Sequence, residues 1–468
     1  MRSRLQQAGL VFLGLLAGIL ISLNFSASAN KEAASPLPVE ELRTFADVFN
    51  AVKSGYVEPV EDKALITHAV SGMLSGLDPH SAYLDQDAFK DLQVGTQGEF
   101  GGLGIEVGME DGFVKVVSPI EDTPAFRAGV KAGDLIIKLD DTIVKGMTLN
   151  DAVKRMRGKP KTDITLTISR KGETKPIVVT LTREVIKVQS VKSKVIEPGY
   201  GYLRVTQFQE NTTANLVKHI NDLYKQGPLK GLVLDLRNDP GGLLHGAIGV
   251  SAAFLPPRSL VVSTDGRTED AKRKYFASGE DYLRGTREDY LKNLPPAIKS
   301  VPMVTLVNGG SASASEIVAG ALQDHKRSIV LGTTTFGKGS VQTILPLTNN
   351  TAIKLTTARY YTPNGRTIQA KGITPDIAVE ETPNGETHAR LREADLERHL
   401  INDKEGEPAP KPEAKPQTKK EAPGKTKPQP KEEGDEELKP PFEFGGKGDY
   451  QLSQALNLLK GLQIIQSK

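Results

Sequence analysis

The sequence predicts an α/β protein with a β-rich module inserted before a larger α/β core and a helical segment in front of both. Apolar residues recur at intervals of three and four from Val39 to Leu92, which is the spacing of helices. Between Gly98 and Arg183 the period changes to two, with glycine-rich turns, as expected of short strands. Strand and helix patterns then alternate from Gly201 to Ile377, which indicates an α/β core.

Length, charge and cysteine content exclude several classes of protein. The 468 residues exceed the roughly 100 to 200 of one domain, so more than one folded unit is expected. Lys and Arg number 60 against 57 Asp and Glu, and a net charge of +3 offers no basic field, so no nucleic-acid partner is predicted. The absence of Cys excludes thiol nucleophiles, disulfides, Cys-ligated zinc and a lipid-modified N-terminal cysteine.

The first residues resemble an export signal. Arg2 and Arg4 precede an uncharged apolar run from Ala8 to Leu23, and a small-x-small sequence ends at Ala29. The run is slightly long for a cleaved signal and short for a membrane span, so residues 1–29 are interpreted as a signal peptide or an uncleaved anchor. We therefore expect a periplasmic or otherwise exported protein, attached to the inner membrane by its N-terminus if the segment is not cleaved.

The C-terminal part has a disordered composition followed by a helical pattern. Residues 403–441 contain nine Pro, nine Lys and ten acidic residues without an aromatic, too little apolar surface to order the chain. We expect a disordered Pro/Lys/Glu-rich linker over 386–446 and an amphipathic helix over 447–468. Docking on its own core and docking on a neighbouring subunit both fit the pattern; the long tether favours the neighbour, and hence a homo-oligomer.

The β-rich module contains a candidate peptide groove. It opens with a glycine turn and a strand: Gly101, Gly102, Leu103, Gly104, Ile105, Glu106 and Val107. Backbone N–H groups of such a turn can hold a carboxylate, and the strand edge can pair with an extended peptide, although these residues alone also fit an ordinary hairpin. Later pairs such as Ser118-Pro119 and Ala128-Gly129, and a helix from Leu149 to Met156, follow at the spacing of PDZ domains. This resemblance implies capture of peptide C-termini by Gly101 to Ile105.

A candidate nucleophile follows the apolar strand from Val301 to Val307. The small residues around Ser313 allow a substrate backbone to approach a helix N-terminus, where free N–H groups favour an oxyanion. Ser313 and Glu316 also fit a capping box, and read alone this stretch is more simply a helix cap.

Lys338 strengthens the catalytic interpretation. It stands in an apolar, glycine-flanked stretch, where desolvation would help it lose a proton and act as a base toward a serine. In an extended chain Gln342 would share its face and could orient the amine. The stretch from Gly332 to Lys338 also opens like a phosphate loop, but Gly339 replaces the required Ser or Thr and the next residues indicate a strand rather than a helix.

Histidine-based catalysis is not supported. His325 lies twelve residues after Ser313 at the end of the same helix, about 18 Å away, and cannot act as its base. His80, His219 and His245 fit turn or surface positions, and no metal-binding spacing occurs, so neither a metal nor another cofactor is predicted.

Together these motifs resemble the carboxy-terminal processing proteases, the tail-specific Ser/Lys peptidase family. The motifs occur in the family's order: Asp78 to Tyr83, Asp235 to Gly242, Ser311 to Glu316, Phe336 to Gln342 and Tyr361 to Arg366. The resemblance implies a crotonase-like α/β protease core with an inserted β-rich PDZ domain and an N-terminal helical segment. For some members of the family it also implies a tetratricopeptide-repeat adaptor lipoprotein. The expected boundaries are 1–29 signal segment, 36–97 helical segment, 98–183 PDZ domain, 184–385 protease core, 386–446 linker and 447–468 terminal helix.

The resemblance also assigns catalytic roles. It makes Ser313 the nucleophile, Lys338 the general base and Gln342 its orienting partner. The oxyanion hole would be formed by the main-chain N–H of Ala314 and of one glycine of the 241–242 pair, preferably Gly242. The expected activity is that of an exported, cofactor-independent serine endopeptidase acting on proteins bound by their C-termini. The alternative is a non-catalytic PDZ scaffold that presents partners through its terminal helix.

Overall fold

The computed structural model describes residues 37–120, 122–285, 288–385, 391–402, 443 and 445–466. The expected signal segment and most of the expected linker lie outside these residues. Within them, no helix combines the length and the apolar character needed to cross a membrane.

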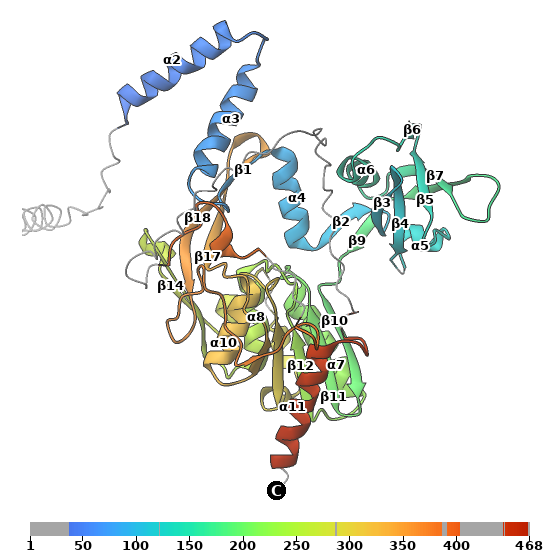
Figure 1. Cartoon of the computed structure of the whole chain (residues 1–468), viewed down its shortest axis with the longest axis vertical. Helices are drawn as coiled ribbons and strands as arrows, with labels where there is room; N and C mark the ends of the chain where they lie inside the picture. Colours follow the sequence, from blue (N-terminus) through green and yellow to red (C-terminus); the bar gives the residue numbers. More distant parts are fainter. Residues whose placement is uncertain are drawn as a thin grey trace, which may run out of the picture. The chain divides into compact units, whose positions relative to one another are not determined.

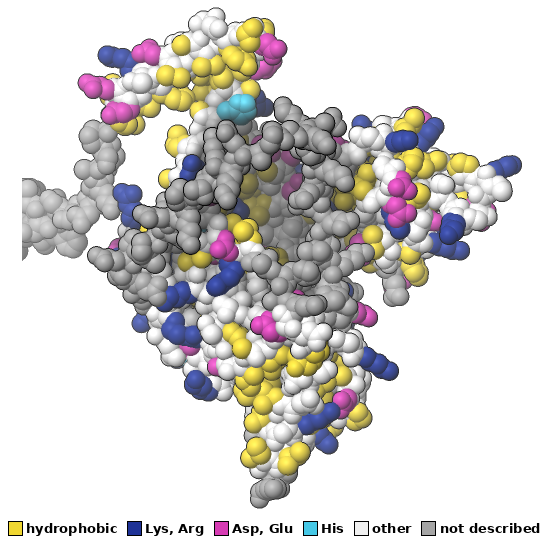
Figure 2. Space-filling model, in the orientation of Figure 1, with side chains coloured by type: hydrophobic (Ala, Val, Ile, Leu, Met, Phe, Trp, Pro, Cys, Tyr) yellow, Lys and Arg dark blue, Asp and Glu magenta, His cyan; other side chains and the backbone are white. Residues whose placement is uncertain are grey.

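The N-terminal helical segment begins with α2 (Val39–Gly55) and α3 (Asp62–Ser75). Residues 37–69 belong to a unit of their own. α2 buries none of its side chains, and Figure 2 shows hydrophobic side chains on its surface. Exposed apolar residues of α2 are Val39, Leu42, Phe45 and Val48.

The end of the helical segment belongs to the fold of the core. A short strand, β1 (Ala82–Leu84), pairs antiparallel with β18 (Ala352–Tyr361), and α4 (Gln86–Gln97) follows it. The β-rich module is therefore inserted in chain order between β1 and the other strands of the core.

The inserted module is an antiparallel sheet with its own apolar core. Strands β2 (Glu99–Gly102) and β9 (Glu184–Lys187) pair where the chain enters and leaves the module. The main sheet has the order β3-β4-β5-β7-β8, with β6 paired to β5. The remaining elements are β3 (Ile105–Glu110), β4 (Phe113–Pro119), α5 (Pro124–Arg127), β5 (Leu135–Leu139), β6 (Thr142–Ile143), α6 (Leu149–Met156), β7 (Asp163–Ser169) and β8 (Ile177–Thr182). Alternate strand residues such as Val114, Val116, Ile164 and Leu166 are buried between the sheet and α6.

The core contains a mainly parallel sheet in the order β10-β11-β12-β15-β16-β19, with β10 antiparallel at one edge. Its strands are β10 (Val191–Glu197), β11 (Tyr200–Val205), β12 (Gly231–Asp235), β15 (Met303–Val307), β16 (Ile329–Gly332) and β19 (Ile377–Ala378). The helices of this region are α7 (Thr212–Lys225), α8 (Leu244–Phe254), α10 (Ala314–Asp324) and α11 (Tyr450–Gln466), drawn in Figure 1. Leu232 and Leu234 pack with α7, α8 and α10, whereas Val233 faces α11, so helices cover both faces of this sheet.

The core contains a second sheet, which is antiparallel and whose strands alternate along the chain with those of the parallel sheet. It runs β1-β18-β13-β14, with β17 paired to β18. Its other strands are β13 (Leu260–Gly266), β14 (Arg273–Phe276) and β17 (Ser340–Pro346). The strand that follows Lys338 excludes the phosphate-loop interpretation, which requires a helix there.

The terminal helix α11 docks on its own chain. Leu452, Ala455, Leu456 and Leu459 are buried against the sheet, together with Val233 and other strand residues. The expectation that this helix docks on a neighbouring subunit is therefore corrected, because its apolar stripe matches a face of the parallel sheet that no other described helix covers. The expected α/β core with an inserted module is confirmed.

Candidate active site

Ser313 occupies a strained position at the start of a buried helix. The chain turns after β15, and Ser313 is the N-cap of α10 with φ +55° and ψ −110°. A positive φ is uncommon for a residue with a side chain. It costs of order 1–3 kcal/mol, which contacts with the surrounding structure must offset. Such strain is concentrated at functional sites.

One buried carboxylate joins the turn of Ser313 to the loop of Lys338. The Ser313 N–H donates to Glu316 Oε2 at 2.7 Å, and the Lys338 N–H donates to the same oxygen at 2.9 Å. The two backbone nitrogens are therefore no more than about 5.6 Å apart, the sum of these two bonds. Oε1 of Glu316 accepts from Gly337 N–H at 2.7 Å and from the Thr335 hydroxyl at 2.6 Å.

Glu316 is fully buried, and burial raises its pKa to about 7 against the opposing effect of the four hydrogen bonds. The sequence suggested Glu316 only as a capping residue of α10. The spacing of a capping box gives no sign of the second loop that this carboxylate binds.

Lys338 has the environment expected of a neutral amine. Its pKa is lowered, first by burial and then by the positive charge of Lys354, while Glu393, Glu316 and Asp78 oppose the shift. Among the described residues, the Lys338 amine has no hydrogen-bond or ion-pair partner, so its lone pair is not engaged by another donor. This combination fits a general base.

Within the described part of the chain, the Gln342 amide forms hydrogen bonds to other groups and none to the Lys338 amine. The register between β17 and β18 shifts between Val341 and Gln342, because Thr357 of β18 is an extra residue between their partners Ala358 and Thr356. The Gln342 amide donates to Ser340 Oγ at 3.0 Å and to Thr356 Oγ1 at 3.3 Å. Thr356 in turn donates to Asp78 at 3.1 Å, which connects Gln342 to the Asp78 motif.

Gly241 lies directly against Ser313 and Ala314. A Cβ on Gly241 would be 2.7 Å from the carbonyl oxygen of Ala312 and 2.9 Å from both Ala314 N and Ser313 Cβ, and its φ is +97°. This position therefore requires glycine, because a side chain disfavours the positive φ and its Cβ would clash with the turn of Ser313.

The structure distinguishes the two candidate oxyanion donors. The Gly241 N–H is occupied by a 2.8 Å bond to Asp239 Oδ1, whereas the Gly242 N–H has no partner among the described residues. As the first residue of α10, Ala314 also has an N–H outside the helical hydrogen-bond pattern. Gly242 and Ala314 are thus the available donors beside Ser313.

A second group of polar side chains lies near Lys338, and of its members only His80 belongs to a motif of the sequence. The His80 ring binds Glu393 at 2.7 Å, and the other oxygen of Glu393 accepts from Gln369 at 2.9 Å. Gln369 also accepts the Gly339 N–H at 3.0 Å, next to Lys338. Glu393 was missed because it lies beyond the last motif of the core, in a segment with no pattern of its own.

The inserted module contains an apolar groove between β3 and α6. A cavity of about 200 Å³ is lined by Phe100, Gly102, Leu103, Gly104, Ile105, Val107, Val153, Met156 and Arg157. Strand β3 is at the edge of its sheet, and the N–H groups of Leu103 and Gly104 have no backbone partner among the described residues. The turn is shorter than the sequence suggested, since Gly101 and Gly102 are paired with β9.

The remaining candidates have structural partners. His325 binds the carbonyl of Leu260 at 2.7 Å, His219 binds Ser193 and His245 binds Glu210. Within the part of the chain that is described, no group of three or more His, Cys, Asp or Glu residues is arranged to hold a metal ion.

Comparison with known proteins identifies the class of enzyme. Residues 199–379 match peptidase family S41, residues 101–181 match the PDZ domain and residues 21–88 match the N-terminal domain of the activating protease CtpB. The protein is thus a serine-type peptidase with a PDZ domain.

Individual relatives narrow the class to one family. The carboxy-terminal-processing protease of Bartonella bacilliformis is 47% identical over 84% of this chain and 87% of the relative. The carboxy-terminal processing protease CtpA of Bacillus subtilis is 36% identical over 71% of this chain and 67% of the relative. The solved structure of a photosystem II D1 C-terminal processing protease is 31% identical and covers 73% of this chain and 93% of that one, with a TM-score of 0.41. The chain belongs to the carboxy-terminal processing protease family, which excludes the non-catalytic scaffold as its class.

Proposed function

We propose that this carboxy-terminal processing protease is an exported endopeptidase that cleaves peptide bonds with a dyad of Ser313 and Lys338. The observation that carries the proposal is the Glu316 carboxylate, which binds the backbone N–H of both residues. It brings a strained serine at a helix N-terminus next to a buried lysine whose pKa is lowered.

The chemistry follows from the positions of these groups. Neutral Lys338 Nζ takes the proton of Ser313 Oγ as the oxygen attacks the substrate carbonyl. The N–H groups of Ala314 and Gly242 then stabilise the negative oxygen of the tetrahedral intermediate. The resulting ammonium returns the proton to the leaving amine, and a water activated in the same way hydrolyses the acyl-enzyme. In this mechanism Gln342 ties Ser340 of its own strand to Thr356 of the neighbouring strand β18 and does not hold the amine directly.

Substrate selection is assigned to the PDZ domain. An extended substrate C-terminus would pair with the free edge of β3, its carboxylate at the unoccupied N–H groups of Leu103 and Gly104 and its last side chain in the groove. Cleavage would then occur upstream of the captured end.

Export and assembly are proposed from the sequence and the family. The basic start, the apolar run and the small residues before Asn30 support export to the periplasm or another external compartment. A homo-oligomer, inferred from the tethered terminal helix, and a tetratricopeptide-repeat adaptor lipoprotein, inferred from the family resemblance, remain predictions. Fractionation of cells that express the tagged full chain would test the compartment, since recovery in the cytoplasm contradicts export.

The dyad is tested with a fluorogenic peptide that carries an apolar C-terminal tail. Ser313→Ala and Lys338→Ala should each lower kcat by at least roughly 10³-fold while the proteins stay folded by circular dichroism. Ser300→Ala is the matched control, since its one hydroxyl contact among the described residues is the bond to the carbonyl of Ala297 at 3.3 Å. Activity of Ser313→Ala above about a tenth of the wild-type value would rule out this serine as the nucleophile.

A further inference from the structure

A buried ion cluster lies at the base of the loop that carries Gly241 and Gly242. The loop begins where β12 ends at Asp235, and Arg237 is its second residue. The Arg237 side chain is fully buried, although it carries a charge that water would otherwise solvate. Its partners therefore decide whether the loop can adopt this conformation.

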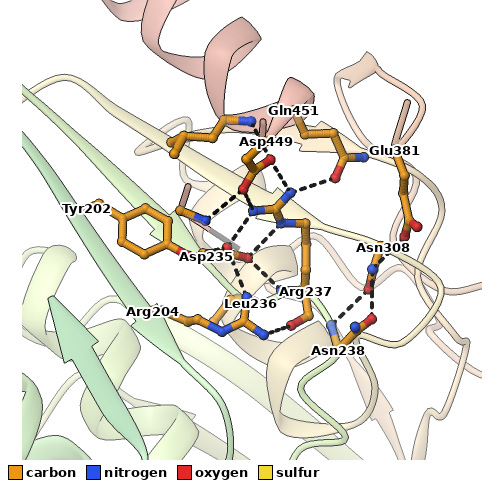
Figure 3. Close-up of polar contacts among 12 residues, drawn as sticks. Tyr202, Arg204, Asp235, Leu236, Arg237, Asn238, Asn308, Glu381, Asp449 and Gln451 are labelled. Atoms are coloured by element: carbon orange, nitrogen blue, oxygen red, sulfur yellow. Dashed lines mark hydrogen bonds and ion pairs between the residues drawn. The ribbon is translucent and has the colours of Figure 1, made fainter. Parts of the chain in front are cut away.

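Arg237 is held from two directions. Its guanidinium donates to Asp235 at 3.0 and 2.7 Å, and from its other side to Asp449 at 2.8 and 2.6 Å. The side-chain oxygen of Gln451 accepts a further bond at 3.0 Å. Figure 3 shows the guanidinium between Asp235 and the Asp449 and Gln451 pair.

Asp449 supplies a second carboxylate to the cluster. Asp235 also binds Arg204 at 3.1 Å, and the Tyr202 hydroxyl donates to it at 2.7 Å. Two guanidinium groups thus face two carboxylates, and the side chains of Arg237, Asp235 and Asp449 are all fully buried. Without Asp449, the fully buried Arg237 guanidinium would lose two charge-assisted hydrogen bonds, and breaking a buried ion pair is strongly destabilising.

Asp449 comes from a distant segment that is anchored on the core. It is 212 positions from Arg237 in the sequence and immediately precedes α11. Its oxygens also accept the N–H groups of Leu452 at 3.1 Å and Gly445 at 2.9 Å, which fixes the start of the helix. Gln451 donates to the carbonyl of Val379, the residue after β19, at 2.7 Å, so the start of α11 is also bound next to the end of this strand.

The loop transmits the position of Arg237 to the nucleophile. The carbonyl of Leu236, the residue before Arg237, accepts from Ser311 Oγ at 2.8 Å. The carbonyl of Asp239 accepts the Ala312 N–H at 3.0 Å and the Ser315 hydroxyl at 2.9 Å. These bonds lie on both sides of Ser313, so the loop and the turn that carries Ser313 form one unit.

From these contacts we infer that Asp449 is a positioning residue for peptide-bond hydrolysis. Through Arg237, it holds the loop of residues 236–242 in the conformation that presents the Gly242 N–H beside Ser313. The C-terminal segment is thus part of the catalytic machinery by its effect on the loop, although it contacts neither substrate nor reacting atoms. The inference rests on the proposed oxyanion hole, and it deepens the proposed function.

The test is chemical rescue in the full-length protein. Asp449→Ala leaves a carboxylate-sized space beside the Arg237 guanidinium, which formate can enter. We expect kcat on the fluorogenic peptide to fall roughly 100-fold with KM changed by no more than about twofold, because one oxyanion donor is misplaced. Formate should restore kcat at least about tenfold, whereas chloride at equal ionic strength should not. A folded variant with kcat within about threefold of wild type, or a loss that formate does not reverse, would overturn the inference.

A control and a second variant separate positioning from general loosening of the helix. Lys460→Ala removes an α11 contact to Glu197 at 2.9 Å, away from the loop, and should have wild-type kcat with and without formate.

If Asp449→Ala does not fold, the isosteric Asp449→Asn is compared with wild type using a peptide aldehyde and the matching peptide alcohol as inhibitors. Only the aldehyde forms an oxyanion, so its Ki alone should rise; equal changes for both inhibitors, or none, would contradict the inference.

The outcome is separable from that of the dyad itself. If Ser313→Ala retains activity, the proposed nucleophile is wrong whatever Asp449 does. If Ser313→Ala is inactive and formate fails to restore Asp449→Ala, the dyad stands and only the positioning inference falls.

Discussion

Substitution of Gly241 by alanine should damage catalysis through contact with the nucleophile turn. The new Cβ would stand 2.7 Å from the Ala312 oxygen and 2.9 Å from Ser313 Cβ, so the turn must retreat by roughly half an ångström to reach ordinary contact distances. Since a misplacement of about 1 Å can cost about 100-fold, we expect kcat to fall by roughly 10- to 100-fold. A 100-fold loss corresponds to about 2.7 kcal/mol of transition-state stabilisation.

Backbone strain alone does not explain such a loss, and a matched variant can show this. Gly146 in the PDZ domain has φ +92°, close to the +97° of Gly241, but a Cβ there meets nothing within 4 Å. Gly146→Ala therefore carries a similar strain, of order 1 kcal/mol, without the contact, and should keep wild-type kcat on a short peptide. The assay is steady-state cleavage of that peptide, with folding checked by circular dichroism. A folded Gly241→Ala enzyme with kcat within twofold of wild type would refute the steric reasoning.

Other substitutions test the base and the groove. Lys338→Arg should be inactive, because a guanidinium stays protonated up to at least pH ~12, and measurable hydrolysis by this variant would exclude an amine base. Removal of the Lys354 charge by Lys354→Met should raise the lowered pKa of Lys338 and move the rise of activity to higher pH; a shift of the pH profile of kcat/KM to lower pH would contradict the assigned effect of Lys354. Val153→Glu places a charge in the PDZ groove and should raise KM for a tailed protein substrate while a short peptide is cleaved normally; equal losses on both substrates would mean that the groove does not capture C-termini.

The local part of the candidate site could be predicted from the sequence. Ser313 follows a buried strand among small residues and begins a helix, and Lys338 stands among glycines before a strand. Both signals depend on a few consecutive residues, so they can be recognised without a structure. The alternation of buried residues likewise allowed the α/β core and the β-rich module to be predicted.

The long-range part of the site could not be predicted. Glu316 binds a loop 19 to 22 positions away, and Arg237 binds Asp449 across 212 positions. Such partners are chosen by the fold, because any acidic residue of suitable reach can neutralise a buried cation. The same holds for α11, whose amphipathic pattern predicted a docking site but could not tell its own sheet from that of another subunit.

The central claim is that Ser313 forms the covalent intermediate and Lys338 activates it. The most direct measurement is mass spectrometry of enzyme quenched during turnover of an activated peptide ester, followed by fragmentation of the peptide that contains the modified residue. The account predicts an acyl group on Ser313 in the wild-type protein and none in Lys338→Ala. An acyl group on Ser311, Ser315 or any other residue, or undiminished acylation without Lys338, would contradict it.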